Sequence, residues 1–145
     1  MISIRQLLER KGSEVWSTSP DSSVYEALQL LAENDVGALL VLQDGELVGV
    51  ISERDYARKV VLRGITSMKT PVKEIMTEDV ITVGPGSTVE EAMALMTDKH
   101  IRHLPVLEGE SIVGVVSIGD LVKAIIADQE FTIGQLENYI SGTRS

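Results

Sequence analysis

The chain contains one unit twice, and no other feature of the sequence constrains its fold as strongly. Residues 15–61 align with residues 80–126 without a gap, at an offset of 65, and 15 of the 47 pairs are identical. Average composition would give about one identity in fifteen. Two unrelated segments would not keep an ungapped register, so the two segments are copies of one structural unit.

Each copy reads as β-α-β-β-α from its hydrophobic periodicity and turn residues. Ser23 and Thr88 each precede an apolar stripe at helical spacing and have a Glu three residues later, which predicts capping boxes. Asp44-Gly45 predicts a hairpin turn in the first copy. The expected elements are approach strands at 15–18 and 80–83, helices ending near 34–35 and 99–100, strands at 38–42 and 104–107, return strands at 47–51 and 112–116, and second helices at 53–62 and 118–127.

Three segments lie outside the repeat. We expect a capped helix over Ile4–Lys11, a helical turn over Val72–Met76 with Pro71 at its first position, and a separate final helix capped by Thr132. The final segment carries an apolar stripe, which needs a surface to cover in the same chain or on a second subunit.

The predicted fold class is therefore α+β. A β-α-β-β-α unit cannot cover both faces of its own sheet, so the two repeats should pack as one domain with pseudo-two-fold symmetry. The expected boundaries are 12–63 for the first repeat, 72–128 for the second and 129–145 for a C-terminal helix, all within a single module of residues 1–145.

Composition argues against several classes of function. The formal net charge of -9 disfavours non-specific binding to nucleic acid and to anionic lipid, because both need clustered cations. The absence of cysteine removes disulfides, thiol nucleophiles and thiolate metal sites. No apolar run approaches the length of a membrane span, and the N-terminus lacks a secretory core. A soluble, cytoplasmic protein without a nucleic-acid or membrane partner is expected.

The same phrase ends the return strand of each copy. It reads Gly-Val, an aliphatic residue, and then Ser-x-x-Asp, at residues 49–55 and 114–120. Each Ser-x-x-Asp is expected at a strand-to-helix turn, where it can form an ordinary helix cap. A helix N-terminus with free amides and a hydroxyl is also an anion site, so the capping and ligand-binding interpretations are compatible.

A tandem β-α-β-β-α unit with this ending resembles the cystathionine-β-synthase (CBS) domain, and the pair resembles a Bateman module. Further matching pieces are Val-Lys-Glu-Ile-Met-Thr at 72–77, Val83-x-Pro85, and Ile-Arg-His-Leu-Pro-Val at 101–106, so the resemblance covers nearly the whole chain. Members of this family bind adenine-containing ligands such as AMP, ATP, S-adenosylmethionine or NAD in clefts between the two repeats. They commonly form flat dimers and act as sensors, not catalysts.

The resemblance implies a half-site in each copy. It places the Ser of each phrase near phosphate and the Asp on ribose hydroxyls, and a carboxylate can accept both hydrogen bonds of a cis-diol. It also implies that the backbone ahead of the first helices contacts the adenine edge. The candidate ligand-binding residues are Thr18, Pro20, Gly37, Ala38, Ser52, Arg54, Asp55, Arg58, Val83, Pro85, Arg102, His103, Pro105, Ser117 and Asp120.

The two half-sites differ in their charged neighbours. Arg54 adjoins the first Asp, where the second copy has Gly119. Arg54 and Arg58 could bind phosphate or could equally form a solvated basic helix face. Arg102 and His103 occur only in the second copy and are candidates for phosphate contacts. No Cys or carboxylate cluster completes a metal site around either His. The two clefts are therefore expected to be unequal.

Three hypotheses for function follow. The first is an adenine-nucleotide-binding regulatory module, with AMP, ADP or ATP favoured and NAD(H) as a further candidate, acting as a homodimer on an unidentified target protein. The alternative is a dimerising scaffold whose clefts are vestigial. The third, a small hydrolase or transferase, is disfavoured because the sequence has no Walker A loop and no GxGxxG after a strand. A non-enzymatic protein is expected.

Overall fold

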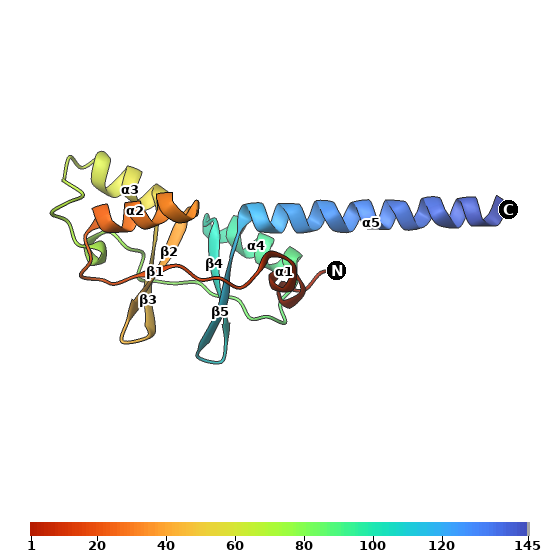
Figure 1. Cartoon of the computed structure of the whole chain (residues 1–145), viewed down its shortest axis with the longest axis horizontal. Helices are drawn as coiled ribbons and strands as arrows, with labels where there is room; N and C mark the ends of the chain where they lie inside the picture. The colour runs from red at the N-terminus through yellow and green to blue at the C-terminus, as the bar shows by residue number, and fades with distance from the viewer. Residues whose placement is uncertain (145) are drawn as a thin grey trace. The chain divides into compact units, whose positions relative to one another are not determined.

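The computed structural model describes residues 1–144, with side chains described through Ser141. Ser145, the last residue of the predicted C-terminal region, lies outside the described residues. Over the part described, the fold is mixed α+β as predicted, with five α-helices and small sheets (Figure 1). Contacts divide the chain into two compact units, one of Val15–Ile81 and one of Met1–Glu14 with the residues from Thr82 onward.

The first unit holds the first repeat and the segment after it. Its sheet has the order β1-β2-β3, with β1 parallel and β3 antiparallel to β2. Asp44 and Gly45 both have positive φ, as the predicted hairpin turn requires. The elements are β1 (Ser17–Thr18), α2 (Val24–Asn34), β2 (Ala38–Gln43), β3 (Glu46–Ser52), α3 (Glu53–Tyr56), the π-helical turn η1 (Ala57–Val61) and the 3-10 turn η2 (Val72–Glu74).

The second unit repeats this plan with one strand fewer. Of the predicted approach strand at 80–83, only Val83 pairs, in a parallel bridge to Val106 that matches the pairing of Thr18 with Val41. Within the described part of the chain, none of the helices is both long and apolar enough to cross a membrane. The elements are α1 (Ile4–Lys11), α4 (Val89–Lys99), β4 (His103–Glu108), β5 (Ser111–Ser117) and α5 (Ile118–Arg144).

Each unit completes its core with a segment from outside its own repeat. Residues 2–8 do this for the second repeat and residues 70–76 for the first, with the same backbone bonds at an offset of 68. The Ile4 amide donates to the Ser87 carbonyl at 2.8 Å, and the Val72 amide donates to the Ser22 carbonyl at 2.8 Å. Ile4 and Val72 are both fully buried. The α1 helix is therefore a structural part of the second repeat.

The glycine of each repeated phrase lets this outside segment approach the sheet. A Cβ on Gly49 would lie 2.6 Å from Met76 Sδ and 3.0 Å from the Thr77 carbonyl oxygen, whereas the three atoms nearest to a Cβ on Gly114 all belong to the Leu8 side chain, with Cδ2 at 2.7 Å. The backbone at Thr77 cannot move aside as easily as the flexible end of the Leu8 side chain can.

We therefore expect Gly49→Ala to lower the free energy of unfolding by about 1–3 kcal/mol and Gly114→Ala to lower it clearly less, as measured by urea denaturation. Equal losses would contradict the backbone contact.

Two predictions about helices are corrected by the structure. The final helix is not separate, because α5 runs without a break from Ile118 to Arg144 (Figure 1). Thr132 does not cap a helix there; its hydroxyl donates to the Asp128 carbonyl at 3.0 Å, which is how threonine is accommodated inside a helix. The helix predicted at 53–62 is present, but its second half widens into η1, closed by a bond from the Leu62 amide to the Ala57 carbonyl.

Three smaller features also differ from prediction. Ser23 and Thr88 cap α2 and α4 through their hydroxyls, but their own amides do not donate to the carboxylates of Glu26 and Glu91, so the predicted capping boxes are incomplete. Pro71 is the N-cap of η2 and not its first helical residue. The box predicted at the start of α1, by contrast, is complete.

Candidate functional site

In the first half-site, the Ser-x-x-Asp phrase forms a complete capping box at the start of α3. Asp55 Oδ2 accepts from the amide of Ser52 at 3.0 Å and from its hydroxyl at 3.0 Å, and the Asp55 amide donates to Ser52 Oγ at 3.2 Å. Lys59, one turn later, places Nζ 3.0 Å from Asp55 Oδ1 and also donates to the Ile75 carbonyl. Both oxygens of Asp55 are therefore engaged within the first unit.

The second half-site repeats the cap at the start of α5 with a different cation. Asp120 Oδ2 accepts from the Ser117 amide at 2.8 Å, and the Asp120 amide donates to Ser117 Oγ at 3.1 Å. Lys11, the last residue of α1, donates from Nζ to the same Oδ2 at 2.6 Å and to the Val115 carbonyl at 2.8 Å. The N-terminal helix thus contributes directly to this half-site.

The two carboxylates differ in how many of their oxygens are used. Within the described residues of its unit, the Asp120 carboxylate accepts from the Ser117 amide and from Lys11 Nζ at the same oxygen, Oδ2. Its Oδ1 remains available to accept a further donor. The Asp120 side chain is 22% exposed, against 13% for Asp55, so it is also the more accessible of the two. The second half-site is therefore better prepared to bind a hydroxyl.

Sequence reasoning missed Lys11, which lies at the candidate half-site in contact with Asp120. Lys59 fills the equivalent role in the first copy, and the position aligned with it in the second copy is Ala124. The second copy therefore has no lysine at the position from which Lys59 contacts Asp55. That difference was the one signal in the sequence that a lysine outside the repeat pairs with Asp120. Nothing local to α1 indicated which lysine this would be, because Lys11 and Asp120 are far apart in the sequence.

The charges around Asp120 set its protonation. Burial alone would raise the pKa of its carboxyl, but the hydrogen bonds from Lys11 and Ser117 and the positive charge of Lys11 hold that pKa below its ordinary value. Asp120 is therefore ionised at neutral pH and acts only as a hydrogen-bond acceptor.

His103 lies opposite Ser117 in the β4–β5 pair. Burial lowers the pKa of its imidazole; the carboxylate of Asp120 raises that pKa, Lys11 and Arg102 lower it, and the net effect is a lowered pKa. His103 is thus neutral at pH 7, where it can donate one hydrogen bond and accept another. The fixed positive charge of this half-site comes from Lys11 and Arg102.

The lowered pKa of His103 predicts a loss of stability in mild acid. The unfolded chain binds a proton at this residue near its ordinary pKa of about 6.5, before the folded chain does, so unfolding is favoured as pH falls through that value. We expect the stability difference between about pH 7.5 and about pH 5.5 to shrink in His103→Gln, measured by urea denaturation. His100→Asn is the control, because His100 has positive φ, which Asn tolerates. An unchanged difference in His103→Gln would contradict this role.

The remaining predicted residues fall into three groups. Val83 and Pro105 lie together in the second unit, where the Val83 amide donates to the Pro105 carbonyl at 3.1 Å. The carbonyls of Pro20 and Pro85 accept from Lys73 and Arg5 of the outside segments, so this backbone is partly occupied. Thr18 lies in β1, and Ala38 is the first residue of β2, directly after Gly37. Arg54 on α3 and Arg58 on η1 are exposed.

The hollow found in the second unit is not this half-site. It is open, has a volume of about 250 Å³, and is lined by the α1 residues Arg5, Leu8 and Glu9 together with Ser13, Pro85, Glu108 and Val113. Pro85 is the one predicted residue among its lining, and Ser117 and Asp120 are not part of it. Arg5 and Glu108 form an exposed ion pair at 3.1 Å on its wall.

Comparison with known proteins identifies related chains. The "CBS domain-containing protein CBSX3, mitochondrial" of Arabidopsis thaliana is 44% identical over 136 residues, 90% of this chain and 66% of the relative. A putative signal-transduction protein with CBS domains from Burkholderia ambifaria has a TM-score of 0.85 at 47% identity, covering 88% of this chain and 96% of its own. A hexameric CBS-CP12 protein from bloom-forming cyanobacteria has a TM-score of 0.76 at 26% identity, covering 84% and 71%.

The family model of the CBS domain matches the chain twice, at residues 3–62 and 72–127. The two matches together span most of the chain and contain both Ser-x-x-Asp phrases. The β-α-β-β-α order of the first unit, the α-β-β-α order of the second repeat and the likeness to solved tandem CBS structures agree with these matches. The chain therefore belongs to the CBS-domain family and carries two CBS repeats in tandem.

Proposed function

We propose that this protein is a regulatory module without catalytic activity that binds an adenine nucleotide, and that it does so chiefly through the second half-site. AMP, ADP or ATP is favoured, and NAD(H) is a further candidate. The bound and free forms would act on a target protein through a homodimer. The observation that carries this proposal is Asp120, a half-buried, ionised carboxylate with one oxygen held in a helix cap and the other available.

The chemistry around Asp120 suits a nucleotide. Its Oδ1 can accept a ribose hydroxyl while Oδ2 keeps its bonds to Lys11 and Ser117, so the cap need not open when the ligand binds. The first amides of α5 and the cations Lys11 and Arg102 favour an anionic group nearby. An acceptor for hydroxyls beside a preference for anions is what a nucleotide requires.

The alternative, a dimerising scaffold, is favoured by the first half-site. Asp55 has both oxygens engaged by Ser52 and Lys59, so helix capping accounts for it completely. A protein in which both phrases served only as caps would bind no nucleotide.

Thermal unfolding with added ligand separates these two functions. A true ligand at a hundred times its dissociation constant should add about 2.7 kcal/mol of stability. We expect that gain with at least one of AMP, ADP, ATP or NADH, and the matching guanine nucleotide tests whether the base contributes to binding. S-adenosylmethionine belongs in the same panel. No stabilisation by any adenine compound would leave the scaffold as the function.

A further inference from the structure

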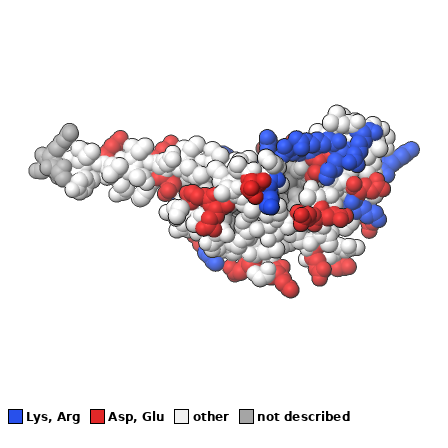
Figure 2. Space-filling model, turned by 180° about the vertical axis from the view of Figure 1, so that it is seen from behind, with Lys and Arg blue, Asp and Glu red and all other residues white. Residues whose placement is uncertain are grey.

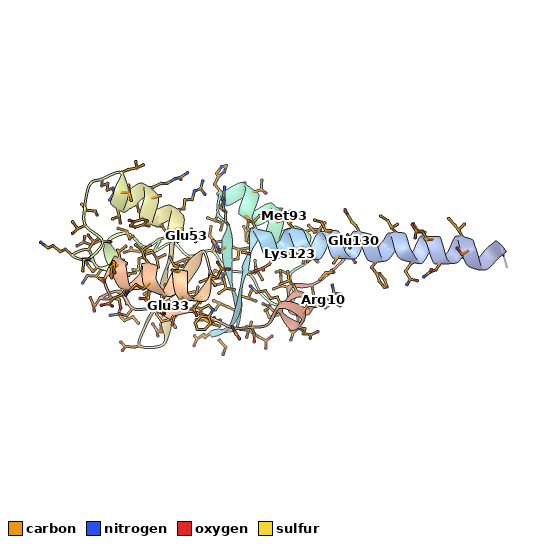
Figure 3. All side chains as sticks on the ribbon, turned by 45° about the horizontal axis from the view of Figure 1, so that its top comes forward. Arg10, Glu33, Glu53, Met93, Lys123 and Glu130 are labelled. Carbon is orange, nitrogen blue, oxygen red and sulfur yellow. The ribbon has the colours of Figure 1, made fainter. Side chains whose placement is uncertain are left out.

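The last part of α5 is exposed along almost its whole described length. Leu121, in the first turn of α5, is fully buried. Every residue from Gln129 to Ser141 is exposed except Gly134, which is partly buried. Figure 3 shows the side chains beyond Glu130 projecting from the helix with no other element of this unit beside them. Such a helix exposes large apolar side chains, among them Phe131, Leu136 and Tyr139.

Most of these apolar residues follow a heptad pattern. With Ile126 at position a, the a and d positions carry aliphatic residues throughout except for one glutamine. This spacing is typical of a helix that packs along another helix, and a single polar residue in such a row commonly sets the register. We call this row the α5 seam; it consists of Val122, Ile126, Gln129, Ile133, Leu136 and Ile140.

We propose that the α5 seam pairs with the α5 seam of a second copy of this chain, with the two helices antiparallel. The seam is complementary to itself, because the two ends of an antiparallel pair bring Val122 to Ile140 and Ile126 to Leu136. This inference rests on the homodimer in the proposed function and names the surface that forms it. It does not depend on nucleotide binding.

The charges beside the seam favour the antiparallel direction. Lys123 and Glu137 are both exposed at position e, two heptads apart. Antiparallel helices bring e positions together, so Lys123 of each copy meets Glu137 of the other, at both ends of the pair. Glu130 of each copy lies beside Glu130 of the other at the midpoint. The antiparallel pair therefore has two opposite-charge pairs and one like-charge pair at position e. A parallel pair would place neither lysine beside a glutamate.

The surface of α5 outside the α5 seam is compatible with an antiparallel pair of helices. On the face shown in Figure 2, the described part of the projecting α5 is mostly uncharged, with separate acidic side chains and no basic cluster that would point to nucleic acid or anionic lipid. Opposite dipoles of antiparallel helices also attract each other.

The oligomeric state of the full chain tests the surface. We expect sedimentation equilibrium to give a dimer for the natural chain and a monomer for Leu136→Glu, with a dissociation constant raised at least a hundredfold. Phe131→Glu is the matched control, because Phe131 is 67% exposed on the same helix but opposite the seam, and it should stay dimeric. Glu is a good helix former, so neither change breaks the helix.

A dimer that persists in Leu136→Glu would overturn the seam while leaving the homodimer itself in place. A monomeric natural chain would overturn both, and a mass of three or more copies would overturn the two-stranded pair. Helix content, by far-ultraviolet circular dichroism, confirms that the variants remain folded.

Cross-linking tests the direction. The chain has no cysteine, so Ile126→Cys and Leu136→Cys each introduce a single thiol. We expect mild oxidation to join chains only when the two variants are mixed, because antiparallel seams place position 126 beside position 136. Disulfide dimers in Leu136→Cys alone would show parallel helices, and no cross-link in the mixture would also overturn the proposed arrangement.

Discussion

Asp120→Ala should weaken adenine-nucleotide binding by roughly 10- to 100-fold, whereas Asp55→Ala should leave it within about threefold. Hydrogen bonds to a charged carboxylate contribute about 1.5–3 kcal/mol, and Asp120 offers an oxygen for them that Asp55 does not. Isothermal titration of both variants with the nucleotide that stabilises the natural chain most would measure the two dissociation constants.

The pair of variants also separates binding from helix capping. Both replacements remove a carboxylate that accepts from the amide of its Ser, so both should lose a similar stability, on the order of 1 kcal/mol. An analogue of the nucleotide without ribose hydroxyls gives a second control, because it should bind the natural chain and Asp120→Ala equally weakly. Equal loss of affinity in Asp55→Ala and Asp120→Ala would contradict the preference for the second half-site.

Ile4→Ala should be the most destabilising single change in α1, at about 2–5 kcal/mol of unfolding free energy. Ile4 has an exposed fraction of 0%, and its amide bonds to the Ser87 carbonyl, so truncation leaves a cavity where α1 meets the second repeat. Arg5→Ala is the control on the same helix. Its ion pair with Glu108 is exposed, and its loss should cost no more than about 0.5 kcal/mol.

This comparison decides whether α1 is part of the second unit in solution. Urea denaturation followed by circular dichroism would report both variants. A loss below about 1 kcal/mol for Ile4→Ala would mean that α1 is not packed as the structure describes. Because Lys11 ends the same helix, loss of α1 packing should also reduce nucleotide affinity through Asp120.

The elements that depend on local signals could be predicted from the sequence. The bounds of α1 at Ile4–Lys11 agree with prediction because Ser3 and Gln6 form their box within one turn. The hairpin at Asp44-Gly45 follows likewise from residues that accept positive φ. The repeat itself was visible because both copies conserve spacing as well as residue type.

The features that depend on distant contacts could not be predicted in this way. The likeness of Ile2–Leu8 to Thr70–Met76 lies at an offset of 68 and not 65, so the ungapped repeat does not contain it. The docking of α1, and with it the place of Lys11 beside Asp120, depends on contacts between residues far apart in the sequence.

The helix at the C-terminus was mispredicted for a different reason. Thr132 and Gln135 have the spacing of a capping box, but a threonine hydroxyl can also bond to the carbonyl four residues earlier, and here it does so. No proline interrupts residues 118–144, so nothing in the covalent structure ends the helix at Ala127. The π-helical turn at Ala57–Val61 has no signal in the sequence that we can identify.

Calorimetric titration of the natural chain with AMP, ADP, ATP and NADH tests the central claim most directly. We expect saturable binding of at least one of them, with one strong site per chain, because Asp55 has both oxygens engaged within its unit whereas the bonds of the Asp120 carboxylate to Lys11 and to the Ser117 amide share Oδ2. Two equal sites per chain would contradict the inequality of the half-sites. No heat of binding with any of the four, on a chain shown to be folded, would contradict the nucleotide-binding function.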